Sequence, residues 1–194
     1  YAAAARLGMF VLLHPHARGG LGLVSVARDQ SLGREVALKQ IRAELADDAR
    51  SRHRFIIEAE ITGQLEHPGI VPVYTLGHDS QGRPFYAMKF VHGRTMAEAI
   101  DEHHRQKPRG SSRELLRRFV GVCEAVAYAH SRGVIHRDLK PSNIMLGGFG
   151  ETCILDWGLA KRVDGKDDPS PVSPALYSGR GLGEGSAGEE VPGP

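Results

Sequence analysis

Short apolar runs separated by turn-forming residues dominate the first half of the chain. They predict three strands, at residues 9–13, 23–27 and 35–41, joined by glycine-containing turns. Because successive side chains of a strand point to opposite faces, the third strand should present Ala37 and Lys39 on one face. Val36 and Leu38 then lie on the other face. This pattern is typical of a small, sheet-rich unit.

A helix and two further strands complete this unit. Apolar positions at helical spacing, with Pro68 just beyond the last of them, predict a helix over residues 47–65. Residues 71–76 and 84–91 read as two more strands, separated by a turn-rich segment. We therefore expect a five-stranded antiparallel sheet with one inserted helix.

The second half of the chain has a helical pattern. It predicts a short helix over residues 95–104 and a longer one from Ser111 or Ser112 to Arg132, with Gly133 at its C-terminal cap. Short apolar pieces follow at residues 134–135, 144–146 and 153–155. Residues 164–194 are rich in Gly, Pro and Ser and lose apolar periodicity, which predicts a disordered tail. The fold class is thus α+β, with a cleft between a sheet-rich lobe and a helical lobe.

Composition excludes several classes of protein. The 194 residues contain 25 Lys+Arg and 23 Asp+Glu, a net charge of +2 that gives no case for nucleic-acid binding. Two cysteines, Cys123 and Cys153, do not form a disulfide framework in a chain this long, so a reducing, cytoplasmic setting is expected. The apolar run at residues 8–13 is too short to span a membrane, and the first residue, Tyr1, suggests that an upstream part is missing.

A glycine-rich turn joins the first two predicted strands. The segment from Ala17 to Val24 approximates G-x-G-x-x-G-x-V, with Ala17 in place of the first glycine and with Gly19 and Gly22 as the other two. Such glycines are often only a hairpin turn, but they also allow backbone N–H groups to approach phosphates closely. A P-loop is excluded, because no Lys-Ser/Thr pair follows and the next element is a strand.

A lysine follows at the end of an apolar strand. In the run Val36–Lys39, the ammonium group of Lys39 either lies in water at a sheet edge or contacts nucleotide phosphates. In the second case a carboxylate on the following helix would hold it. Glu58 is the better candidate for that carboxylate, and Glu60 is the alternative.

The most specific motif is the segment His136–Asn143. It matches H-R-D-L-x-x-x-N at every fixed position, and Asp156-Trp157-Gly158 follows a short strand in the place of D-F-G. Together with Lys39, these motifs make the chain resemble bacterial serine/threonine protein kinases of the eukaryotic-like type. The resemblance runs from about Leu12 to Lys161, and the sequences of its motifs are similar to those of planctomycete-type kinases.

The resemblance implies a bilobal fold with ATP and Mg²⁺ as ligands and a Ser/Thr hydroxyl of a protein as substrate. Asp138 would accept the hydroxyl proton, Lys140 would contact the γ-phosphate, and Asn143 and Asp156 would hold magnesium. Lys39, fixed by Glu58, would position the α- and β-phosphates. Trp157 would be a packing residue, and His136 a structural histidine.

The same resemblance implies an adenine site formed by both lobes. Val24 and Ala37 would lie above the adenine ring and Met145 below it. Met88 would guard the back of the pocket, and backbone groups of Lys89 and Val91 would bind the edge of the ring. The paired histidines His103 and His104 are expected to be a solvated helix end.

The resemblance divides the chain into four parts. These are an N-terminal remnant (1–8), an ATP-binding lobe (9–91), a partial helical lobe with the catalytic loop (92–163) and a tail (164–194). The motifs expected after Lys161, including A-P-E, are missing, which predicts exposed apolar side chains on the long helix, among them Leu116, Phe119 and Val126.

Two other interpretations stay open. One is a kinase fragment that binds a nucleotide or a partner without catalysis. The other is a small-molecule kinase of the aminoglycoside-phosphotransferase type, although such enzymes usually read H-G-D where this chain has His136-Arg137-Asp138.

Overall fold

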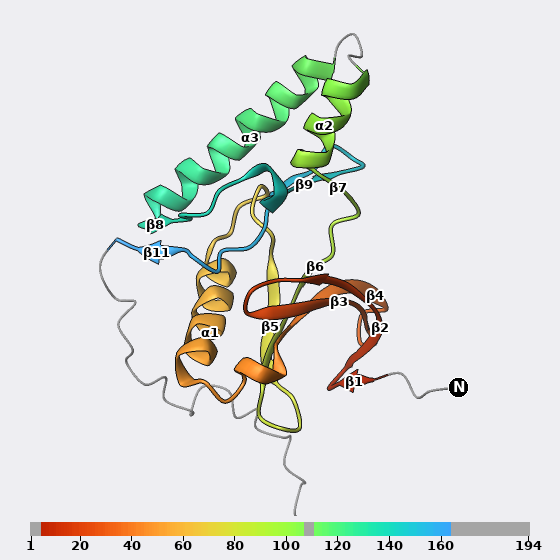
Figure 1. The fold of residues 1–194 in the computed structure, drawn as a ribbon, viewed down its shortest axis with the longest axis vertical. Coiled ribbons are helices and arrows are strands. Elements are labelled where there is room, and N and C mark those ends of the chain that lie inside the picture. The colour runs from red at the N-terminus through yellow and green to blue at the C-terminus, as the bar shows by residue number, and fades with distance from the viewer. Residues whose placement is uncertain (1–4, 107–110, 164–194) are drawn as a thin grey trace, which may run out of the picture.

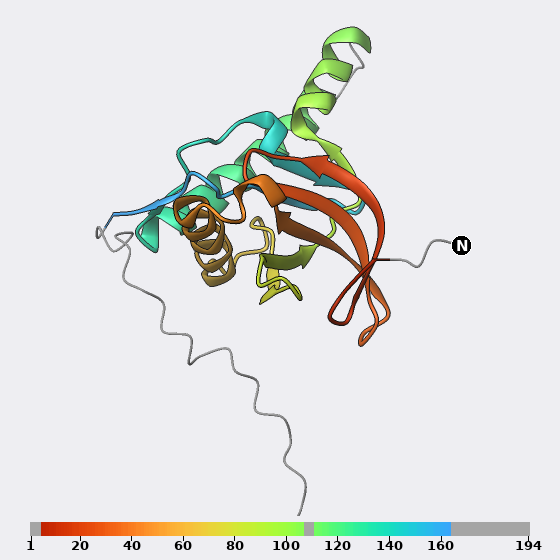
Figure 2. The same cartoon turned by 60° about the horizontal axis from the view of Figure 1, so that its bottom comes forward.

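A computed structural model describes residues 5–106 and 111–163 of the chain. Its first part is a six-stranded antiparallel sheet of strand order β1-β2-β3-β4-β6-β5. The strands are β1 (Arg6–Leu7), β2 (Phe10–Arg18), β3 (Gly22–Asp29), β4 (Arg34–Ile41), β5 (Val73–His78) and β6 (Pro84–Lys89). Figure 2 shows that β2, β3 and β4 curl strongly. A 3-10 turn (Ala43–Leu45) leads from β4 into α1 (Ala49–Gln64), which packs beside β5.

The sheet has one strand more than the sequence predicts, within the segment expected to be an N-terminal remnant. The additional strand, β1, pairs with β2 through Leu7 and Phe10, and both side chains are buried in the sheet's core. A turn at Gly8, whose φ is 56°, joins the two strands. Two residues are too short to show a period of two, so the sequence pattern carried no signal for β1.

Several strand boundaries also differ from the predicted ones. β2 extends to Arg18 because the part that contains Pro15 lies at the sheet edge and bulges locally, where a proline is tolerated. β5 starts at Val73 because the N–H of Val71 donates instead to the carbonyl of Ile154 in the other half of the molecule. β6 ends at Lys89, where the chain turns into the connector between the two halves.

The second part contains the helices α2 (Met96–Gln106) and α3 (Ser111–Ser131), which lie side by side away from the sheet (Figure 1). A three-stranded sheet is formed by β7 (Gly93–Thr95), β9 (Ile144–Gly147) and β10 (Thr152–Ile154). The short strands β8 (Val134–Ile135) and β11 (Lys161–Arg162) form a separate pair. Gly133, with φ 72°, lies one residue beyond the C-terminal cap residue Arg132 of α3, where a left-handed glycine commonly ends a helix, as predicted.

The long helix α3 is only half covered by the described residues. Val122, Ala125 and Ala129 are buried in the core that the helices share with β9 and β10. Leu116 and Phe119 are 64% and 53% exposed, as predicted, whereas Val126 packs against the core. The segment expected to be disordered, 164–194, lies outside the described residues. Within residues 5–106 and 111–163, no helix combines the length and the apolar character needed to cross a membrane.

Candidate active site

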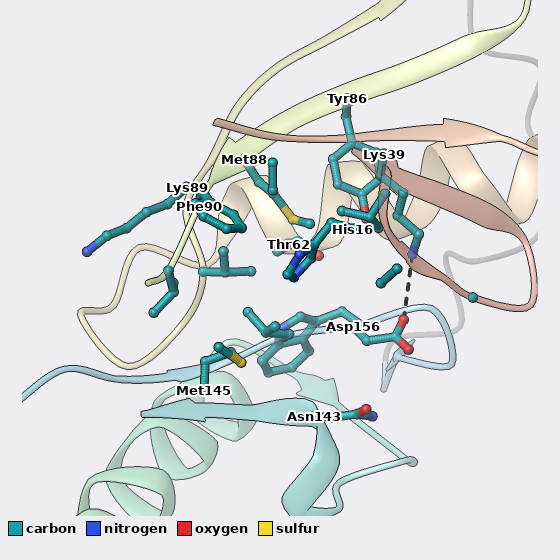
Figure 3. A pocket seen from close by; sticks show the side chains of 18 of the residues that line it. His16, Lys39, Thr62, Tyr86, Met88, Lys89, Phe90, Asn143, Met145 and Asp156 are labelled. Carbon is teal, nitrogen blue, oxygen red and sulfur yellow. Dashed lines mark ion pairs between the residues drawn. The ribbon is translucent and has the colours of Figure 1, made fainter. Parts of the chain in front are cut away.

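The two halves enclose a cavity of about 380 Å³ beneath the turn between β2 and β3. Figure 3 shows Lys39, Tyr86 and Met88 above it, and Asn143 and Met145 below it. The predicted site residues that line the cavity are Ala17, Gly19, Val24, Ala37, Lys39, Glu58, Met88, Lys89, Val91, Asn143, Met145 and Asp156. Asp138, Lys140 and Gly22 are outside this lining.

The register of the sheet explains how the upper wall forms. β4 turns Val36 and Leu38 into the core of the sheet, and this leaves Ala37 and Lys39 on the cavity side, as predicted. Ala37 lies opposite Met88 in β6, and Lys39 lies opposite Tyr86. Alternation along two paired strands therefore places all four side chains on one face.

Glu58, and not Glu60, is the carboxylate that holds Lys39. Lys39 Nζ donates to Glu58 Oε1 at 2.5 Å, and both residues are buried, at 7% and 2% exposure. Lys39 Nζ also lies 3.7 Å from Asp156 Oδ1, the ion pair drawn in Figure 3. Since a buried charge is costly without a partner, Glu58 stabilises the ammonium group at the rear of the cavity.

The glycine-rich turn is closed by a hydrogen bond of its own backbone. The N–H of Gly19 donates to the carbonyl of Gly22 at 2.8 Å. A Cβ on Gly22 would lie 2.9 Å from Cγ of Lys39, so the glycine allows the backbone of β3 to pass close to that side chain. The structural requirement for Gly22 is therefore a close approach to Lys39, which the sequence motif did not specify.

The lower wall is positioned by the β9–β10 hairpin. Ile144 pairs with Ile154, so the residues just before β9 and just after β10 meet at one end of the hairpin. The N–H of Leu155 donates to the carbonyl of Asn143 at 2.7 Å, which brings Asn143 and Asp156 to the same end. Asp156 has a φ of 52°, a left-handed conformation that is uncommon outside glycine and often found at functional sites.

Asp138 and Lys140, which lie outside the cavity lining, are linked by hydrogen bonds to each other and to Asn143 of the lining. Lys140 Nζ donates to Asp138 Oδ2 at 2.8 Å, and Asn143 Nδ2 donates to the carbonyl of Asp138 at 3.0 Å. The hydrogen bond from Lys140 lowers the pKa of Asp138, and the same contact raises the pKa of Lys140. Asp138 is therefore a charged carboxylate at neutral pH.

The donor set fits a magnesium ion. Asn143 uses its Nδ2 group to bind the Asp138 carbonyl, which leaves its Oδ1 atom to face a ligand. Asp156 adds a carboxylate that is 52% exposed. An amide oxygen and a carboxylate are ligands that Mg²⁺ prefers, with phosphate oxygens and water completing its shell.

Lys89 lines the cavity, but its side chain does not point into it. Its side chain points away from the cavity in Figure 3 and pairs with Glu151. Its N–H donates to the carbonyl of Pro72 at 3.0 Å and is therefore not available to a ligand. That backbone groups of Lys89 and Val91 bind an adenine edge stays a prediction, which for Lys89 concerns its carbonyl and not its N–H.

Trp157 and His136 support the loop formed by residues 136–143 through packing and hydrogen bonds. Trp157 is 1% exposed and packs in the helical core, and its ring centroid lies 4.6 Å from that of His136. His136 Nδ1 accepts from the N–H of Asp138, which leaves Nε2 to donate to the carbonyl of Leu155 at 3.2 Å. Both contacts suit a neutral, structural histidine.

The burial of His136 predicts a pH-dependent stability. Burial lowers the pKa of His136 from its ordinary value of 6.5, so the unfolded chain takes up this proton more readily. The free energy of unfolding should be highest above pH 6.5 and fall as the pH drops from 6.5 toward the folded-state pKa. Urea unfolding at about pH 7.5 and about pH 5.5 measures this difference.

Two variants assign the effect to His136. The replacement His136→Asn should reduce the difference between the two midpoints, because it removes the buried titrating group. The same replacement at the exposed His14 should leave it unchanged. An equal pH dependence in the unaltered chain and in His136→Asn would contradict the assignment.

Several cavity residues were missed by sequence reasoning. They include His16, Thr62, Tyr86, Phe90 and Leu155. Tyr86 could have been found, since in a strand it shares a face with Met88. His16 and Phe90, whose ring centroids are 5.2 Å apart, meet only when the β2–β3 turn folds over the connector. In the last turn of α2, His103 forms an exposed hydrogen bond with Ser112 Oγ at 3.2 Å.

Comparison with known proteins agrees with this geometry. The family model described as the protein kinase domain matches residues 16–178. The serine/threonine-protein kinase PknD of Protochlamydia amoebophila is 44% identical over 155 residues, which cover 76% of this chain and 16% of the relative. The kinases of the same name from Chlamydia muridarum and Chlamydia abortus are 42% and 40% identical over 150 and 158 residues. These cover 74% and 78% of this chain.

The chain spans only 16–17% of the length of these curated relatives. The match nevertheless covers the described cavity, the catalytic loop and the Asp156-Trp157-Gly158 segment. The chain therefore belongs to the protein kinase domain family, and its relatives are serine/threonine-protein kinases.

Proposed function

We propose that this chain binds ATP with Mg²⁺ in the cavity between its two halves and transfers the γ-phosphoryl group to a Ser or Thr hydroxyl of a protein. The observation that carries the proposal is the buried Lys39–Glu58 pair facing Asp156 across the cavity. A positive group fixed opposite a carboxylate suits a phosphate chain bridged by a metal ion.

The cavity has the polarity that this ligand requires. Val24, Ala37 and Met145 make one end apolar, which suits a purine ring, and the carbonyl of Lys89 supplies an acceptor for its amino group. Lys39 and Asp156 make the other end charged. When bound between Asn143 and Asp156, Mg²⁺ would neutralise charge on the phosphate oxygens.

In the proposed transfer, Asp138 orients the substrate hydroxyl and accepts its proton. The hydroxyl oxygen forms a bond to the γ-phosphorus, the bond from this phosphorus to the β–γ bridging oxygen breaks, and ADP leaves. Lys140, which pairs with Asp138 in the structure, would turn toward the γ-phosphate and so free the carboxylate for the hydroxyl. Lys39 would hold the α- and β-phosphates in place.

Titration calorimetry tests the binding step. The unaltered chain should bind ATP with an affinity at least about tenfold higher with Mg²⁺ than with an excess of EDTA, because the metal ion links the phosphates to Asp156 and Asn143. GTP is a matched control ligand, since it carries the same phosphates with a different ring edge and should bind more weakly. An ATP affinity that does not depend on Mg²⁺ would contradict the assigned metal ligands.

A further inference from the structure

A buried tyrosine hydroxyl reaches the carboxylate that holds Lys39. Tyr86 lies in β6 directly opposite Lys39 in β4, and it is 3% exposed. Its Oη atom donates to Glu58 Oε1 at 2.8 Å, the same oxygen that accepts from Lys39 Nζ at 2.5 Å. Glu58 in helix α1 is thus bound to two neighbouring strands of the sheet.

Glu58 depends strongly on these two donors. Its side chain is 2% exposed, and within the described part of the chain no donor binds its other oxygen, Oε2. Without the hydroxyl of Tyr86, Lys39 alone would orient the carboxylate. A buried carboxylate that loses one of two donors is less well stabilised and less firmly oriented.

Lys39 has a second acceptor within reach. Asp156 Oδ1 lies 3.7 Å from Lys39 Nζ on the opposite side of the cavity (Figure 3). A loosely held Glu58 would therefore let the ammonium group shift toward Asp156. Such a shift would move the positive charge away from the phosphates and occupy a magnesium ligand.

The position of the tyrosine hydroxyl is itself fixed by packing. The ring of Tyr86 packs against Phe55 of α1, with ring centroids 5.3 Å apart, and Lys39 Nζ lies 5.7 Å from the centre of the ring. Burial and the negative charge of Glu58 raise the pKa of Tyr86 well above its ordinary value. The phenol is therefore protonated and acts as a hydrogen-bond donor at physiological pH.

We propose that Tyr86 is a positioning residue, which fixes Glu58 and, through Glu58, sets Lys39 for the phosphates of the bound nucleotide. The inference rests on the proposed function, since it assigns Lys39 to the phosphates. Its consequence is selective: Tyr86 affects the binding of the phosphate chain but not the binding of the adenosine part.

The test compares two ligands on a variant that loses only the hydroxyl. Tyr86→Phe keeps the ring and its packing on Phe55, so the cavity should keep its shape. In calorimetric titrations, the Kd of Mg·ATP should rise about tenfold, while the Kd of adenosine should stay within about twofold. Tyr74→Phe is the control, because Tyr74 lies on the adjacent strand β5, is 39% exposed and should leave both affinities unchanged.

Three results would overturn the proposal. An unchanged Mg·ATP affinity in Tyr86→Phe would show that the hydroxyl is not needed, and an equal loss for adenosine and Mg·ATP would assign Tyr86 to packing alone. Failure of the unaltered chain to bind Mg·ATP would refute the proposed function itself, and the inference with it. Binding of adenosine by Tyr86→Phe also verifies that the variant is folded.

Discussion

Replacing Lys39 with Met should lower the free energy of unfolding by about 3–5 kcal/mol. The replacement leaves the carboxylate of Glu58 at 2% exposure, with the hydroxyl of Tyr86 as its remaining donor. Breaking one half of a buried ion pair costs far more than the net value of the pair, because the other charge stays buried without compensation. Urea unfolding, followed by circular dichroism, measures the change.

Two further variants separate this cause from a general loss of packing. In the triple variant Lys39→Met, Glu58→Leu, Tyr86→Phe, all three polar groups are replaced by apolar ones, so most of the lost stability should return. The control is Arg117→Met, which breaks an exposed pair with Glu114 and should change stability by less than about 1 kcal/mol. A triple variant no more stable than Lys39→Met would refute the electrostatic explanation.

The replacement Asp138→Asn should reduce the rate of phosphoryl transfer by about 100- to 10,000-fold. Asparagine preserves the shape of the side chain but has no carboxylate to accept the hydroxyl proton. Because Asp138 lies outside the lining of the nucleotide cavity, the Kd of Mg·ATP should stay within about twofold of its original value. Transfer of radiolabelled phosphate to a generic protein substrate measures the rate.

Asp101→Asn is the matched control for this prediction. Asp101 is exposed on α2, and its replacement makes the same chemical change without affecting transfer. Transfer by Asp138→Asn at the rate of the unaltered chain would exclude Asp138 as the proton acceptor. A large loss of Mg·ATP affinity in this variant would instead place Asp138 among the binding residues.

Much of the site could be predicted because short motifs and strand periodicity act locally. Alternation in the run Val36–Lys39 predicted which side chains share a face, and the register of β4 agrees. The resemblance to protein kinases predicted that Asn143 and Asp156 belong to one site, and the β9–β10 hairpin brings them to the same end.

Other features depend on contacts between distant segments, which a sequence pattern does not encode. The hydrogen bond from Tyr86 to Glu58 joins residues 28 positions apart, and it forms only when α1 packs against β6. Likewise, Lys89 turns away from the cavity because Glu151, 62 residues later, lies behind the connector. A strand of two residues such as β1 is visible only once its partner strand is in place.

Phosphoryl transfer by the chain itself is the property that decides whether it is an active kinase. Incubation with γ-labelled ATP, Mg²⁺ and a generic protein substrate should yield phosphoserine or phosphothreonine after acid hydrolysis, and EDTA should abolish the label. A chain that binds Mg·ATP in the cavity, yet transfers no more label than the Asp138→Asn variant, would contradict the proposed transfer and leave a nucleotide-binding kinase fold without catalysis.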